Sequence, residues 1–149
     1  MNSRIKRFAA TGAIAVALPV GMLATTATSA SAQTGMTIKN PATGLCLEAD
    51  NSPFDVNAVF ARGCNGAAGQ SWTVSLPGTV MNVGNGGCLE ARWDGPVVTS
   101  MCDDANPFQQ WRASGDGLRN LVTGRCLQVF DDGFVATQEC NSGQQWTIS

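Results

Sequence analysis

The sequence of 149 residues contains no histidine and no tyrosine. Without histidine a chain has no imidazole base near neutral pH, no Ser-His-Asp triad and no histidine ligand for zinc. The sequence also lacks a glycine-rich phosphate loop, an EF-hand loop and a Cys-x-x-Cys pattern. These absences argue against the common hydrolytic mechanisms and against a bound metal. We therefore expect no catalytic residue, no metal site and no cofactor.

The one long apolar stretch lies near the N-terminus. Three basic residues precede a mostly apolar run over residues 8–24, and small residues follow at 30–32. This order is typical of a secretory signal peptide. A transmembrane anchor is the alternative, but the run is short for a span of ~20 residues and is interrupted by two glycines and Pro19. Residues 1–32 are therefore predicted to be a signal, and the mature chain, 33–149, is predicted to be secreted.

Basic residues are scarce in the predicted mature chain. Loss of the signal leaves 11 acidic against 6 basic residues, a formal net charge of −5. Nucleic acids and anionic membranes are bound through clustered lysine and arginine. We expect neither as a partner of the mature chain, and we expect a monomer.

The mature chain repeats itself three times. Each copy has an asparagine six residues before its first cysteine, a glycine two before it and a leucine directly after it, then a second cysteine and a Gln-x-Trp motif. The first cysteines are 42 and 38 residues apart, so a repeat of about forty residues fills this part of the chain. The copies span about residues 36–75, 79–114 and 117–149. The repeated residues are Asn40, Gly44, Cys46, Leu47, Cys64, Gln70 and Trp72; Asn82, Gly86, Cys88, Leu89, Cys102, Gln109 and Trp111; Asn120, Gly124, Cys126, Leu127, Cys140, Gln144 and Trp146.

The repeat also bears on disulfides and secondary structure. Six cysteines of an exported chain allow 15 pairings, and one pair per copy is the simplest. Strand-forming segments, 36–39, 46–49, 58–62 and 71–74 in the first copy, are short and separated by turn signals, without a long apolar pattern at helical spacing. The sequence predicts an all-β fold of about twelve short strands, with a positive φ at the glycine before each first cysteine. The predicted disulfides are Cys46–Cys64, Cys88–Cys102 and Cys126–Cys140.

Three copies of Gly-x-Cys-Leu, a second cysteine fourteen to eighteen residues later and a closing Gln-x-Trp resemble the ricin B-chain type lectin domain, or QxW lectin repeat. The resemblance covers residues 36–149. It implies a β-trefoil, a six-stranded barrel capped by three hairpins, with at most one shallow sugar pocket per copy. The size of an indole and the resemblance both place the motif tryptophans, Trp72, Trp111 and Trp146, in the core.

The resemblance also implies which residues bind sugar, and this sequence departs from that pattern. In the family a carboxylate two residues after the first cysteine accepts from sugar hydroxyls, an aromatic ring two before the second cysteine stacks on the sugar, and an Asn-Gln pair completes the pocket. The acid position holds Glu48, Glu90 and Gln128, the aromatic position Arg62, Ser100 and Gln138, and the asparagine position Gly69, Phe108 and Gly143. We retain as sugar-binding candidates Glu48, Arg62 and Gln70; Glu90 and Gln109; and Gln128, Gln138 and Gln144. The alternative is that the two glutamates are solvated strand residues and the motif glutamines brace the backbone.

Trp93 is a further candidate outside the motif. It lies five residues after Cys88, beside Asp94-Gly95, and so near a predicted hairpin tip. It either replaces the missing stacking residue or caps the barrel. Capping is the interpretation that we favour for the aromatic residues in comparable stretches of the other copies, Phe54, Phe130 and Phe134.

The sequence therefore predicts a secreted, free-standing carbohydrate-binding module without enzymatic activity, which binds glycan or polysaccharide weakly through several sites at once. The alternative is a β-trefoil that has lost its sugar sites and binds a protein, for instance as an inhibitor. Adjacent acids at Asp103-Asp104 and Asp131-Asp132 are more typical of turns than of the facing carboxylates of a glycosidase.

Overall fold

The computed structural model describes residues 34–52, 56–115 and 117–149. The predicted signal, residues 1–32, and Phe54 lie outside these described residues. The described part holds twelve short β-strands and two 3₁₀ turns, with four strands in each of the three sequence copies. No helix in this part is long and apolar enough to cross a membrane.

The first copy contains β1 (Ile38–Lys39), β2 (Leu45–Ala49), β3 (Asn57–Gly63), the 3₁₀ turn η1 (Ala68–Gln70) and β4 (Trp72–Val74). The second contains β5 (Val80–Asn82), β6 (Cys88–Ala91), β7 (Val97–Ser100), the 3₁₀ turn η2 (Pro107–Gln109) and β8 (Trp111–Ser114). The third contains β9 (Gly117–Asn120), β10 (Cys126–Val129), β11 (Val135–Gln138) and β12 (Thr147–Ile148). The strands agree with the all-β prediction, whereas the two 3₁₀ turns were not predicted, because three residues are too few to show a helical period.

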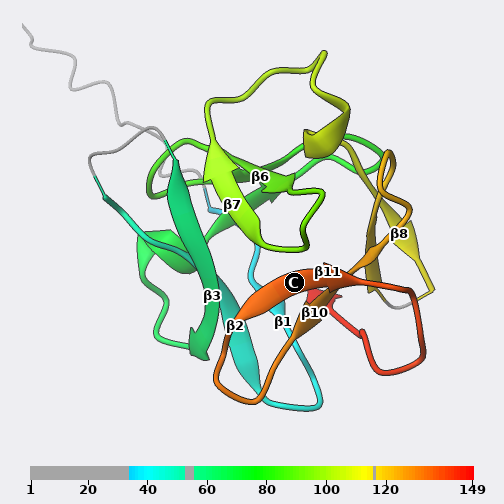
Figure 1. Ribbon diagram of the computed structural model, residues 1–149. Coiled ribbons are helices and arrows are strands. Elements are labelled where there is room, and N and C mark those ends of the chain that lie inside the picture. Colours follow the sequence, from blue (N-terminus) through cyan, green and yellow to red (C-terminus); the bar gives the residue numbers. More distant parts are fainter. Residues whose placement is uncertain (1–33, 53–55, 116) are drawn as a thin grey trace, which may run out of the picture. The chain divides into compact units, whose positions relative to one another are not determined.

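The second and third strands of each copy form an antiparallel hairpin: β2–β3, β6–β7 and β10–β11. The three hairpins come together in the fold (Figure 1). Strand β3 pairs with β7, and isolated bridges join Phe60 to Phe134 and Pro96 to Ala136. Each hairpin therefore contacts the other two, which gives the described residues a pseudo-threefold arrangement.

The first and fourth strands connect one copy to the next. Strand β4 pairs with β5, β8 pairs with β9, and β12 of the third copy returns to pair with β1 of the first. Within the first two copies, backbone bridges from Met36 to Trp72 and from Gly78 to Trp111 bring the outer strands together. This ring of six strands with three hairpins is the arrangement that the β-trefoil resemblance predicts.

The repeated apolar residues build the core. All three motif tryptophans and the leucines after the first cysteines are buried. A buried indole N–H needs an acceptor, and in each copy it donates to the main-chain oxygen of that copy's leucine. These hydrogen bonds are Trp72 to Leu47 at 2.9 Å, Trp111 to Leu89 at 2.8 Å and Trp146 to Leu127 at 3.0 Å.

Disulfides and glycines follow the repeat as well. The bonds Cys46–Cys64, Cys88–Cys102 and Cys126–Cys140 each lie within one copy, as expected. The glycine two residues before each first cysteine has the positive φ that favours glycine over any side chain, with values of 72°, 71° and 67° at Gly44, Gly86 and Gly124.

The repeated asparagine links neighbouring copies, a role that the sequence did not reveal. Asn82 is buried; its side-chain oxygen accepts from the backbone N–H groups of Gly84 and Asn85, and its amide group donates to the carbonyl oxygen of Gly69 in the preceding copy. Asn120 donates in the same way to Phe108, and Asn40 donates to Gln145 of the third copy. The loop that carries each motif glutamine is therefore held by the copy that follows it in the ring.

Candidate functional site

The glutamine of each Gln-x-Trp motif is buried and holds the residue two positions after the first cysteine. Its side-chain oxygen accepts a backbone N–H from the loop after the second cysteine. Its amide nitrogen donates to the strand residue and to a nearby main-chain carbonyl. The amide-to-strand hydrogen bonds are Gln70 to Glu48 at 2.6 Å, Gln109 to Glu90 at 3.0 Å and Gln144 to Gln128 at 3.0 Å. The glutamines thus brace the backbone and also position the strand residue, which is an acid in the first two copies and Gln128 in the third.

In the first copy the acid is already paired within the protein. Oε1 of Glu48 lies 2.8 Å from Nη1 of Arg62, and its Oε2 accepts from Gln70. The same Arg62 nitrogen is 3.3 Å from Asp50, and the guanidinium lies 5.0 Å from the centre of the Phe60 ring. The structure therefore brings all three candidates of this copy together, with Arg62 covering the Glu48 carboxylate.

In the third copy the candidate residues are neutral and only partly assembled. Gln128 accepts from Gln144, so these two lie together. Gln138 is exposed at the end of β11, opposite Cys126, and in the described part of the chain it makes no hydrogen bond to either glutamine. The acid position of the sugar-binding pattern therefore carries no carboxylate in this copy.

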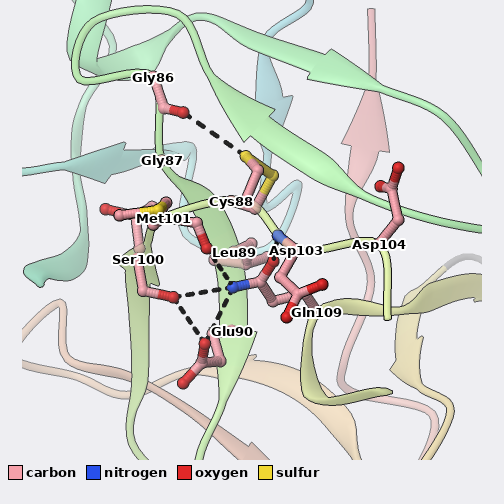
Figure 2. Close-up of a disulfide and its surroundings, with 12 residues drawn as sticks. Gly86, Gly87, Cys88, Leu89, Glu90, Ser100, Met101, Asp103, Asp104 and Gln109 are labelled. Carbon is pink, nitrogen blue, oxygen red and sulfur yellow. Dashed lines mark hydrogen bonds between the residues drawn. A yellow bond between two sulfur atoms is a disulfide. The ribbon is translucent and has the colours of Figure 1, made fainter. Parts of the chain in front are cut away.

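In the second copy Glu90 lies at the centre of a set of hydrogen-bond donors. Its Oε2 accepts from Oγ of Ser100 at 2.6 Å, from Gln109 at 3.0 Å and from Asn106 at 3.1 Å. Its Oε1 lies 3.2 Å from Nε of Arg92. Figure 2 shows the side chains of Glu90, Ser100 and Gln109, from β6, β7 and η2, pointing toward one another beside the Cys88–Cys102 disulfide. The carboxylate is thus fixed in place while its side chain stays 12% exposed.

These contacts also set the charge of Glu90. Burial by itself raises the pKa of this carboxyl group, but the hydrogen bonds from Ser100 and Gln109, with smaller contributions from Arg92 and Asn106, outweigh it and leave the pKa below the ordinary value of 4.5. Glu90 is therefore ionised at neutral and mildly acidic pH, when a carboxylate can accept hydrogen bonds from hydroxyl groups.

Two cavities lie beside Glu90. One, of about 470 Å³, is also lined by Ser100, Met101 and Asn106. The other, of about 270 Å³, is lined by Glu90, Ala91, Arg92, Trp93 and Phe108. Both are open to solvent, and the acid is the residue that they share.

Trp93 lies in the hairpin turn after β6 and is 67% exposed. Its ring meets that of Phe108 edge to face, with centroids 5.1 Å apart and planes at 81°. Because most of its surface faces solvent, Trp93 does not cap the core and is free to contact a ligand. The capping role favoured for Phe134 is not supported by its burial either, since that ring is 39% exposed and packs on Phe130 outside the core cluster.

Sequence reasoning missed Asn106 and Arg92. The family pattern places an asparagine directly before the motif glutamine, whereas Asn106 stands three residues before Gln109 and caps η2 by accepting from the N–H of Phe108. An Asn-Pro pair ahead of the motif is the signal that could have revealed it. Arg92 lies two residues after Glu90 and directly after the end of β6, a spacing that in an extended chain puts both side chains on one side.

The adjacent acids are turn residues, as the sequence predicts. Asp103 accepts from the N–H of Ala105, and Asp132 accepts from the N–H of Phe134. Among the residues that the structure describes, no group of three or more potential ligands is placed to hold a metal ion.

Comparison with known proteins bears on both fold and site. The family model described as the ricin-type beta-trefoil lectin domain matches residues 34–146. No curated protein sequence matches the chain. The beta-trefoil lectin of the Vibrio vulnificus hemolysin/cytolysin, solved with N-acetyl-D-lactosamine bound, is similar with a TM-score of 0.67 and 22% identity over 77% of this chain and 93% of that one.

Two further solved structures are similar. The C-half of the earthworm R-type lectin, in complex with GalNAc, has a TM-score of 0.66 and 17% identity over 76% of this chain and 97% of the lectin. GalNAc-T7, solved with UDP, GalNAc and Mn²⁺, has a TM-score of 0.64 and 18% identity over 77% of this chain but only 22% of that protein. At these identities the likeness shows the fold, which confirms the β-trefoil.

Proposed function

Because the chain belongs to the ricin-type beta-trefoil lectin family, we propose that it is a secreted, non-catalytic carbohydrate-binding module. The observation that carries the proposal is the arrangement around Glu90. A fixed, ionised acceptor stands among amide and guanidinium donors at the edge of two open cavities, with the exposed ring of Trp93 alongside. Sugars present hydroxyl groups and an apolar ring face, and these groups complement both parts of the site.

The second copy is the principal site in this proposal. Two cavities adjoin its acid, and the exposed ring of Trp93 lines one of them. In the first copy Arg62 pairs with both Glu48 and Asp50, and the third copy has an uncharged glutamine at the acid position. Sugar binding in the first and third copies is weaker than in the second. On a polymer these weaker sites would still increase retention, because several sites of one molecule can bind the same polymer at once. The stoichiometry of sugar binding measures how many copies take part.

A lack of catalysis is part of the proposal. It is supported by Asp103 and Asp132, whose carboxylates bind backbone N–H groups of their own turns rather than facing a second acid across ~5 to 10 Å. Since this chain spans only about a fifth of GalNAc-T7, the likeness to that protein concerns a fold that is also part of a longer chain.

The test is a glycan array probed with the oxidised protein, followed by retention on insoluble polysaccharide and on a galactose resin. We expect binding to at least one glycan class and release by the matching free sugar. Glu90→Gln keeps the shape of the side chain but removes its charge, so it should weaken binding about tenfold, the factor that 1.4 kcal/mol of lost interaction produces. Glu139→Gln, at an exposed acid outside the pockets, is the matched control and should change nothing. No binding to any glycan would overturn the proposal.

The alternative function, protein binding, is favoured by one observation: the ion pair between Arg62 and Glu48, which engages the acid of the first copy within the protein. A pull-down that recovers one dominant protein, in equal amount with and without free sugar and with both the parent protein and Glu90→Gln, would support it.

Secretion is tested separately by recovering the protein from culture medium and determining its N-terminus, which we expect within a few residues of Gln33.

A further inference from the structure

The two cavities of the second copy meet at one side chain. Glu90 lines both, while Asn106 and Met101 line only the larger and Trp93 only the smaller. Their volumes, about 470 and 270 Å³, lie near the lower end of small-molecule sites, ~300–1,000 Å³. Each is therefore suited to one small unit, and units in both would lie next to each other.

The partners of the two Glu90 oxygens line different cavities. Oε2 accepts from Ser100 and Asn106, both of which line the larger cavity. Oε1 pairs with Arg92, which lines the smaller one. Groups bound in the two cavities would thus lie beside the same fixed acid and next to different partners of it.

The smaller cavity differs from the larger in having an aromatic wall. The ring of Phe108 meets Trp93 edge to face at the hairpin tip, and the indole stays 67% exposed. An exposed indole beside hydrogen-bonding groups suits the apolar face of a pyranose ring. The larger cavity has instead the flexible, 77% exposed Met101 at its rim.

We propose that this site binds two consecutive sugar units of one chain, one on each side of Glu90, with Trp93 selecting for the second unit. The ligand is then an oligosaccharide or polysaccharide segment rather than a single terminal sugar. The inference rests on the proposed function and deepens it. Two linked units bind more tightly than one because the second enters at high effective concentration once the first is held.

The experiment is calorimetric titration of the oxidised protein with three matched pairs: galactose and lactose, glucose and cellobiose, and xylose and xylobiose. For the pair that binds, we expect the disaccharide to bind at least about tenfold more tightly than its monosaccharide, a modest fraction of the gain that linkage can produce. Trp93→Ala should bring this ratio close to one. The substituted side chain is mostly exposed, so the variant should fold, which circular dichroism checks.

Phe134→Ala provides the matched control, since this ring is also an exposed aromatic on a hairpin, but in the third copy. It should leave the ratio unchanged. Equal binding of both members of a pair, a ratio that survives Trp93→Ala, or a ratio that Phe134→Ala also lowers would overturn the inference while leaving sugar binding intact. Binding of none of the six sugars, together with a blank glycan array, would instead overturn the proposed function and this inference with it.

Discussion

Nη1 of Arg62 lies 2.8 Å from Oε1 of Glu48, so in the first copy the residue at the aromatic position of the sugar-binding pattern pairs with the acid of that pattern. The register explains why. Arg62 stands opposite Cys46 on the neighbouring strand, two residues from the acid and therefore on the same face. In the second copy the same place holds Ser100, which donates to the acid, and the arginine that pairs with the acid is Arg92. The two copies share the arrangement of their strands, but the pairing arginine lies on the neighbouring strand in the first copy and just after the acid's own strand in the second.

Removing Arg62 should make the Glu48 carboxylate of the first copy available to a sugar. For Arg62→Ala we expect a second, weaker sugar site to appear in the calorimetric stoichiometry, because Glu48 then keeps only its bond to Gln70. The cost in stability should be below about 1 kcal/mol, since the arginine side chain is 50% exposed. A fall in sugar binding would instead mean that Arg62 itself contacts the sugar.

Replacing the motif glutamine of the second copy should cost both stability and binding. Gln109→Ala leaves the N–H of Asp103 and the carbonyl oxygen of Met101 without their partner and frees the Glu90 carboxylate to move. We expect a loss of about 1–3 kcal/mol in urea denaturation. The protein that remains folded should bind sugar more weakly, because Gln109 no longer holds the Glu90 carboxylate.

The neighbouring Gln110→Ala is the control for Gln109→Ala. Its amide makes an exposed hydrogen bond to Asp104 at 3.3 Å, so its removal should change stability by less than about 0.5 kcal/mol. Equal losses from the two variants would show that the buried position of Gln109 has no special role.

The sequence was sufficient to predict what repetition and burial determine. Trp111, Leu89 and the Cys88–Cys102 bond follow from residues that recur at fixed offsets, because a core position tolerates few side chains. The site was less predictable. The direction of Arg62 depends on cross-strand register, and the contact of Asn106 with Glu90 depends on a three-residue turn, neither of which leaves a periodic pattern.

Reduction should abolish cooperative folding. Each disulfide joins residues 14 or 18 positions apart, and closing a loop of ~15 residues contributes about 3 kcal/mol in the chain-entropy model. The stability lost with all three disulfides is comparable to the whole ~5–15 kcal/mol stability of an ordinary domain. We expect the protein in strong reductant to show no cooperative transition in urea, whereas the oxidised protein shows one. A sharp transition in the fully reduced protein, checked by thiol titration, would contradict this.

The charge of Glu90 should make stability depend on pH in a defined direction. Burial raises the pKa of this group, but the hydrogen bonds from Ser100 and Gln109 and the charge of Arg92 lower it by more. The pKa in the folded protein is therefore below the ordinary value of 4.5. A carboxyl group whose pKa is depressed by folding adds stability above its unfolded pKa, and that contribution is lost as the pH falls through the folded value. The parent protein should therefore lose more stability than Glu90→Gln between pH 7 and pH 3 in urea denaturation. Equal losses would show that the contacts around Glu90 do not favour its ionised form. That result would remove the physical argument for a charged acceptor at this site.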